Sequence, residues 1–128
     1  MCLNMFLKTI FLLFVATLFY GCPSEELTSA RLYVKENNWE KAEEMLTAAI
    51  EVTPEDPEPY FLMGKEIYAR NVEWTKMNEM FNKAAELGPT YKLPDGQSLL
   101  AAIETWRMFY WSGEYNKGAD NFNLALNA

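Results

Sequence analysis

The chain of 128 residues contains no histidine, and this absence excludes several kinds of active site. Ser-His-Asp triads, histidine-based acid-base pairs and the commonest zinc sites all require an imidazole. The 6 glycines are scattered along the chain, so no glycine-rich loop is available to hold a phosphate group. We therefore predict a protein that is not an enzyme, with no catalytic residue, no metal site and no cofactor.

Carboxylates are plentiful, but their positions favour structural roles. Glu55, Asp56 and Glu58 form a cluster where a helix cap and first-turn acids are expected. The segment from Pro94 to Gln97 lacks the alternating oxygen ligands of a calcium loop. We predict that this segment is a turn.

Basic residues are the scarcer charge, since 11 lysines and arginines accompany 18 aspartates and glutamates. Lys8 is the only charge in residues 1–21, so the remaining chain has 10 basic and 18 acidic residues and a formal net charge of −8. A surface this acidic repels nucleic-acid phosphates and anionic lipid head groups. Nucleic-acid binding is not expected.

One apolar run stands out at the start of the chain. The 11 residues from Ile10 to Tyr20 have a single polar interruption, which is the length of a signal-peptide core and too short to cross a membrane as a helix. The residues from Leu18 to Cys22 resemble the lipobox of bacterial lipoproteins. The resemblance implies a signal peptide of residues 1–21, cleavage before Cys22 and a lipid on its thiol. An ordinary secretory signal and an uncleaved anchor are the alternatives.

The resemblance also implies where the protein is found. Cys2 would leave with the signal and Cys22 would be acylated, so no thiol would be free for a disulfide. Pro23 stands where an aspartate would hold an enterobacterial lipoprotein at the inner membrane. We therefore expect a bacterial envelope protein anchored in a membrane by its lipid, with the outer membrane facing the periplasm favoured.

An internal repeat organises the rest of the chain. Trp39, Ala42, Leu46, Ala49 and Pro54 lie on one stripe of a helix that the proline ends, and the same spacing returns 35 residues later. The second copy comprises Trp74, Met77, Phe81, Ala84 and Pro89. A fainter third copy comprises Gly113, Glu114, Tyr115, Lys117, Gly118, Phe122, Ala125 and Leu126. A period of this length is typical of an α-solenoid.

These residues resemble the tetratricopeptide repeat (TPR) family, whose 34-residue unit is a helix A, a turn and a helix B. The resemblance implies an all-α solenoid of about three units within one domain, residues 22–128. The units would cover residues of about 23–56, 57–91 and 99–128. One extra residue in the second unit is expected at Asn71 to Glu73, and the third unit departs from the pattern at Trp106 and Gly118.

The helix boundaries follow from caps and prolines. Ser24 and Asn38 are suitable N-caps, Asp56 caps the next helix, and Pro57 suits its first position. The second pair is expected at about 57–70 and 74–87. The third pair is expected at about 98–112 and from residue 115 onward.

Nothing after Leu126 could cover Phe122 in the last predicted helix. Three explanations are open: a second protein or another copy covers this end, the sequence is a fragment, or the exposed apolar patch is tolerated.

In TPR proteins the helices A line a concave groove, and the resemblance places a basic row of Arg31, Lys65 and Arg107 there. Cations beside flat apolar side chains suit an extended, acidic peptide. The predicted groove residues are Arg31, Lys35, Phe61, Lys65, Tyr68, Arg107, Tyr110 and Trp111. The alternative is that Glu66 and Glu104 neutralise these cations locally. Tyr33, Trp39, Trp74, Phe81 and Phe122 are expected in the core.

Two functions remain open at this point. The first is a lipid-anchored protein-interaction module or assembly scaffold that binds a peptide in the helix A groove, with self-association through the uncapped last helix as a further possibility. The second is a glycan-binding envelope lipoprotein that uses the aromatic residues of the third unit. Those residues are Trp106, Tyr110, Trp111 and Tyr115.

Overall fold

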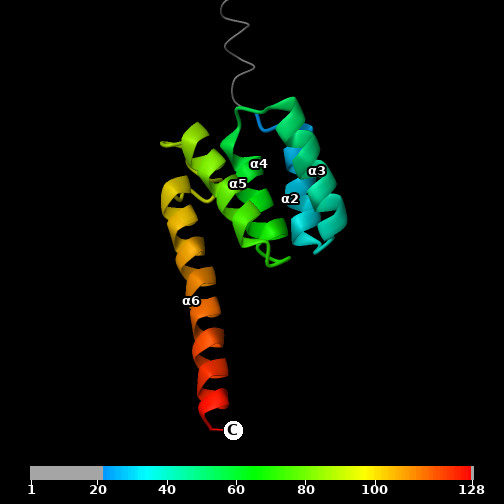
Figure 1. The fold of residues 1–128 in the computed structure, drawn as a ribbon. Coiled ribbons are helices and arrows are strands. Elements are labelled where there is room, and N and C mark those ends of the chain that lie inside the picture. The colour runs from blue at the N-terminus through cyan, green and yellow to red at the C-terminus, as the bar shows by residue number, and fades with distance from the viewer. Residues whose placement is uncertain (1–21, 128) are drawn as a thin grey trace, which may run out of the picture.

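The computed structural model describes residues 22–127, which are almost entirely helical (Figure 1). The predicted signal peptide and Cys2 lie outside the described residues. The elements are α2 (Glu25–Lys35), α3 (Trp39–Val52), α4 (Pro57–Leu62), the π-helix η1 (Met63–Tyr68), α5 (Trp74–Leu87) and α6 (Leu99–Leu126). The all-α class is therefore confirmed.

Helices α2 and α3 form an antiparallel pair with the expected caps. The Ser24 hydroxyl accepts a hydrogen bond from the Leu27 backbone N–H at 3.1 Å, and Asn38 caps α3. Glu25 and Glu26 lie in the first turn of α2, where carboxylates favour the helix dipole. The boundaries agree with the prediction within two residues.

The second pair consists of α4 with η1, followed by α5. Asp56 caps α4 through the Glu58 backbone N–H at 3.0 Å, and Pro57 occupies the first turn, where its missing N–H costs nothing. Helix α5 begins at Trp74 and ends before Gly88, as predicted.

The turns inside the two pairs have the same geometry at positions 35 residues apart. Asn37 and Val72 both have positive φ, 57° and 61°, and the following N–H donates to the carbonyl of Tyr33 or Tyr68. Asparagine adopts this conformation readily, whereas a β-branched valine is strained in it. Because the turns match, the prediction that the extra residue lies at 71–73 was wrong.

The π-helix η1 absorbs that residue instead. The Ala69 N–H donates to the Gly64 carbonyl five residues earlier, and such a widened turn holds one more residue than an α-turn. Gly64 belongs to this segment because a Cβ there would lie 2.9 Å from the Phe81 ring. The widened turn thus keeps both ends of the helix packed on α5.

Two buried clusters hold the helices together. One joins the α2–α3 pair to η1 and comprises Leu27, Ala30, Ala42, Leu46, Ala49, Met63 and Ile67. The other joins α4, α5 and the start of α6 and comprises Tyr60, Phe61, Ala69, Met77, Phe81, Ala84, Leu99, Ala102 and Ile103. The stripe predicted from the repeat is therefore the core of α3 and α5. Of the five expected core aromatics, Phe81 is fully buried, and Tyr33, Trp39 and Trp74 are half-buried.

Residues 88–98 form a loop that returns the chain to α6. The Leu93 N–H donates to Gln97, the Leu99 N–H donates to Tyr91, and Gly96 has a φ of 85°. Residues 94–97 thus form the predicted turn.

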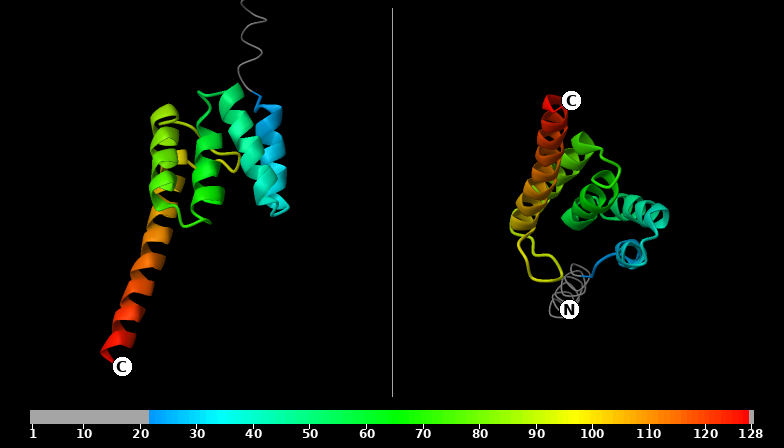
Figure 2. Two further views of the ribbon diagram at one scale, coloured as in Figure 1. Left: turned by 45° about the vertical axis from the view of Figure 1, so that its right-hand side comes forward. Right: turned by 90° about the horizontal axis from the view of Figure 1, so that it is seen from below.

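Helix α6 differs from its prediction. A pair of helices was expected, but Leu99–Leu126 is one uninterrupted helix that extends well beyond the other helices (Figure 1, Figure 2). No proline lies between Ser112 and Tyr115, and continuing the helix satisfies backbone groups that a turn would expose. The expected turn was therefore wrong. Phe122, predicted in the core, is 63% exposed for the same reason.

Candidate functional site

A cleft of 320 Å³ lies where α2 faces α4 and η1, and we name it the α2–α4 cleft. Four of the eight predicted groove residues line it: Arg31, Lys35, Phe61 and Lys65. The other lining residues are Val34, Glu58, Leu62, Glu66, Leu93, Pro94 and Asp95. Apolar walls and three cations are thus brought together as the sequence predicted.

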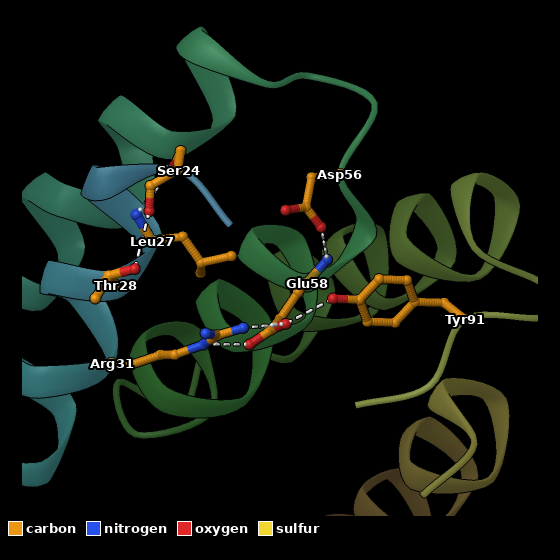
Figure 3. Close-up of polar contacts among 7 residues, drawn as sticks. All are labelled: Ser24, Leu27, Thr28, Arg31, Asp56, Glu58 and Tyr91. Atoms are coloured by element: carbon orange, nitrogen blue, oxygen red, sulfur yellow. Dashed lines mark hydrogen bonds and ion pairs between the residues drawn. The ribbon is translucent and has the colours of Figure 1, made fainter. Parts of the chain in front are cut away.

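The floor of this cleft is an ion pair between Arg31 and Glu58 (Figure 3). Two guanidinium nitrogens donate to the two carboxylate oxygens of Glu58, each at 2.7 Å, and the Tyr91 hydroxyl donates to one of these oxygens at 2.8 Å. Glu58 is only 2% exposed. A bidentate pair with a third donor satisfies both oxygens of the buried carboxyl group.

Three groups in and around this ion pair have raised pKa values. The hydrogen bond to Glu58 raises the pKa of Arg31, so this guanidinium stays charged. Burial, together with the bond to the Glu58 carboxylate, raises the pKa of Tyr91 above its ordinary range. Asp56 is half-buried, and loss of solvent raises the pKa of its carboxyl group. Arg31 is therefore a structural cation whose charge is already neutralised.

Lys65 is also paired within the chain. Its ammonium lies 2.8 Å from the Glu66 carboxylate and 4.6 Å from the centroid of the Trp106 ring. Lys35 is exposed, and no ion pair is found for it among residues 22–127. Lys35 is thus the cation of the cleft most available to a ligand.

Two of the predicted aromatic groove residues have structural contacts instead. Phe61 is 3% exposed and stacks on Phe81 with ring centroids 5.8 Å apart, so it is mainly a core residue and contributes one apolar wall of the cleft. Tyr68 packs on both core clusters, and the Lys76 ammonium lies 5.4 Å from its ring centroid. Tyr68 lines neither cleft described here.

The remaining three predicted residues lie in a second cleft of 450 Å³ between α5 and α6, named the α5–α6 cleft. It is lined by Trp74, Met77, Asn78, Glu104, Arg107, Met108, Tyr110, Trp111 and Glu114. Trp74 and Tyr110 contact each other with ring centroids 5.4 Å apart. The predicted groove is thus divided into two separate clefts, because α6 packs on α5 through its first turns only.

Arg107 is held by the walls of the second cleft. Its guanidinium donates to Asn82 at 2.7 Å and to Glu104 at 3.1 Å. Its Nε is the one buried side-chain nitrogen or oxygen without a hydrogen-bond partner in the part of the chain that the structure describes. All three members of the basic row therefore have acidic partners, including Glu66 and Glu104, as the alternative proposed.

Sequence reasoning missed the role of Glu58, which it assigned to a capping cluster. The sequence holds no signal for this role, because the partners Arg31 and Tyr91 lie 27 and 33 residues away from Glu58. Leu93 and Asp95 were also missed, and only the unusual length of the loop before α6 hinted at them.

The first described residue is Cys22, which is exposed and lies two positions before the Ser24 cap. Within residues 22–127, no helix is long and apolar enough to cross a membrane, and no three metal-binding side chains are grouped together. No protein-family model, curated protein or solved structure matches this chain.

Proposed function

We propose that this protein is a non-catalytic, TPR-like interaction module that binds an extended peptide segment of a partner protein. The repeat of turn geometry between the two helix pairs supports a repeat architecture. The observation that carries the function is the α2–α4 cleft, which combines apolar walls with accessible cations. A repeat module of this kind presents its ligand surface on the outside of rigid helices.

The chemistry of this cleft selects the ligand. Val34, Leu62 and Leu93 offer apolar contacts, and Lys35 and Lys65 offer ammonium donors at the rim. The Arg31–Glu58 pair is satisfied internally and contributes shape rather than charge. An extended peptide with one or two carboxylates beside apolar side chains therefore fits best.

Fluorescence anisotropy with labelled peptides of differing charge tests the proposal. We expect acidic-apolar peptides to bind the full chain and the double variant Lys35→Gln, Lys65→Gln to bind at least tenfold more weakly, about 1.4 kcal/mol. Binding should also weaken as salt rises, because exposed charges are screened. Lys83→Gln is the control, since Lys83 lines neither cleft. Equal binding by the double variant and the control would refute the peptide site.

A second candidate rests on the α5–α6 cleft. Trp74, Tyr110 and Trp111 supply flat aromatic faces, while Asn78 and Glu104 supply polar groups, a combination suited to a sugar ring. Oligosaccharide binding would then depend on Trp111 and show little response to salt. Loss of binding in Trp111→Ala but not in Lys35→Gln would favour this glycan function over the peptide function.

We further propose that a lipid on Cys22 holds the module at the bacterial envelope. The exposed cysteine lies directly before the folded helices, so a lipid there would keep them close to the membrane surface. Palmitate labelling and membrane fractionation of the full chain beside Cys22→Ala test this. We expect the wild type to be labelled and membrane-bound and the Cys22→Ala variant to be unlabelled. Absence of label from both proteins would mean that residues 1–21 are an ordinary secretory signal and that Cys22 carries no lipid.

A further inference from the structure

The distal half of α6 has an apolar face that nothing in the described chain covers. The C-terminal part of α6 extends past α5 (Figure 2), and every residue from 111 to 126 except Ala119 is exposed. Trp111, Tyr115 and Phe122 each expose more than 60% of their surface. An isolated helix of this kind gains little stability without a partner for its apolar side chains.

These side chains follow a seven-residue pattern along one side of the helix. Glu104, Met108, Trp111, Tyr115, Gly118, Phe122 and Ala125 alternate between steps of four and three residues. Such alternation is the seam of a two-helix coiled coil, in which each position faces the partner helix. The seam begins in the α5–α6 cleft and continues without interruption along the exposed helix.

We propose that the seam binds a second copy of this chain, with the two α6 helices antiparallel and crossing at Tyr115. In this register Trp111 lies opposite Gly118 of the second copy, and Met108 lies opposite Phe122 of the second copy. A Cβ at Gly118 would meet nothing within 4 Å, so space for the indole is available. Phe122 of each copy enters the α5–α6 cleft of the other.

Charge favours the antiparallel arrangement over a parallel one. Parallel helices would place Glu104 against its own copy in the seam, whereas antiparallel helices place it opposite Ala125.

The area is sufficient for a specific dimer. Large aromatic side chains bury roughly 150–250 Å² each, so three rings that are about two-thirds exposed contribute roughly 400 Å² per copy. Two copies, with Met108 and the walls of the cleft added, approach the roughly 1,000–1,200 Å² at which stable interfaces begin. A single two-fold axis relates the copies, so the assembly closes as a dimer.

Disulfide trapping tests the orientation in the full chain, solubilised in detergent, with Cys2 and Cys22 changed to serine. In the antiparallel dimer, Tyr115→Cys lies at the axis and should form a cross-linked dimer under mild oxidation. Gly118→Cys should not, because its two copies would be separated by about six residues along the helix, roughly 9 Å. Cross-linking of both variants would indicate a parallel pair, and cross-linking of neither would refute the dimer.

Analytical ultracentrifugation of the full chain tests the seam itself. Phe122→Glu should raise the dimer dissociation constant at least 100-fold, because it places a charge in the partner's apolar cleft. Leu124→Glu is the matched control, since Leu124 is 70% exposed but lies off the seam, and its effect should stay within a few fold. Neither variant removes a core residue, so both should fold. A monomeric wild type, or equal loss in both variants, would overturn the proposal.

Discussion

Glu58 accepts three hydrogen bonds from outside its own helix, although it is almost completely buried. Arg31 on α2 and Tyr91 in the loop before α6 donate to it, so one carboxylate connects the first helix pair, the second pair and the returning loop (Figure 3). Removing one member of a buried pair leaves the other charge without compensation.

We therefore expect Glu58→Gln to lower the free energy of unfolding by about 2–4 kcal/mol, because an amide N–H₂ would face the guanidinium. Urea denaturation followed by circular dichroism measures the change. Glu86→Gln is the control, since the Glu86 side chain is largely exposed and its contact with Lys83 is 3.9 Å. A loss below about 0.5 kcal/mol in Glu58→Gln would show that the pair does not stabilise the fold.

Tyr91 makes the same cluster sensitive to alkaline pH. Its pKa is higher in the folded protein than in the unfolded chain, so folding favours the neutral phenol. That contribution is complete below the ordinary tyrosine pKa of about 10 and is lost as the pH rises beyond it. Tyr91→Phe should therefore cost about 1–2 kcal/mol at neutral pH through the lost hydrogen bond, and this cost should shrink above about pH 10.

Urea denaturation of wild type and Tyr91→Phe across this pH range tests the prediction. Tyr33→Phe serves as the control because the Tyr33 hydroxyl has no hydrogen bond in the described chain and Tyr33 lies outside the proposed seam. A difference between wild type and Tyr91→Phe that is independent of pH would mean that the phenol titrates alike in both states.

At the scale of elements, α2, α3, α4 and α5 could be predicted from sequence, whereas the π-helix η1 and the uninterrupted α6 could not. Side-chain caps fix the starts of α2, α3 and α4, and Pro57 suits the first turn of α4 because its missing N–H costs nothing there. The start of α5 has no side-chain cap and follows from the repeat of Trp39 at Trp74. The first helix of the third pair was expected to end at Ser112, but only the spacing of the repeat indicated this end. No proline follows Ser112, and spacing alone does not end a helix.

In the candidate site, too, some residues could be predicted from the sequence and others could not. The four predicted residues of the α2–α4 cleft come from α2, α4 and η1, which belong to the first two copies of the repeat. Arg107 and Trp111 were assigned to the same groove by extending the repeat to α6, and they lie in another cleft. The partners of the basic residues depended on side chains far apart in sequence, as with Arg31 and Glu58, which spacing alone cannot predict.

The π-helix η1 gives an element-scale prediction. Its widened turn accommodates one residue more than the repeat requires, so deleting Glu66 should restore an α-helix and keep both flanks packed on α5. We expect a change of less than about 1 kcal/mol in unfolding free energy. Deleting Glu44 from α3 is the control, because it would rotate Leu46 and Ala49 out of the core and cost more than about 3 kcal/mol. Equal losses would show that η1 holds no surplus residue.

At the scale of the whole molecule, the packed helices and the distal half of α6 are energetically separate. Stopping the chain after Ser112 removes no residue of either buried cluster. Dilute protein should therefore keep its unfolding free energy within about 0.5 kcal/mol. Stopping after Glu104 also removes Trp106 and Tyr110, which pack on the core, and should cost several kcal/mol. Only the full chain should show a melting temperature that rises with protein concentration, since only it can dimerise.

Helix α2 begins three residues after Cys22, and its start lies at the opposite end of the described chain from the tip of α6 (Figure 1, Figure 2). An antiparallel dimer through α6 therefore directs its two Cys22 residues away from each other. If both proposals hold, two copies lipidated in one membrane cannot pair through this seam, whereas copies in two facing membranes can. The dimer would then connect two lipid surfaces.

Vesicles carrying the lipidated full chain test this consequence. Light scattering should show clustering of wild-type vesicles and none with Phe122→Glu, while Leu124→Glu, whose substitution lies off the seam, should cluster like wild type. Added soluble Cys22→Ser protein should suppress clustering, because it occupies the seam without a second anchor. Dimers that form within one membrane and leave vesicles dispersed would mean that the copies are parallel, with both cysteines directed toward the same surface.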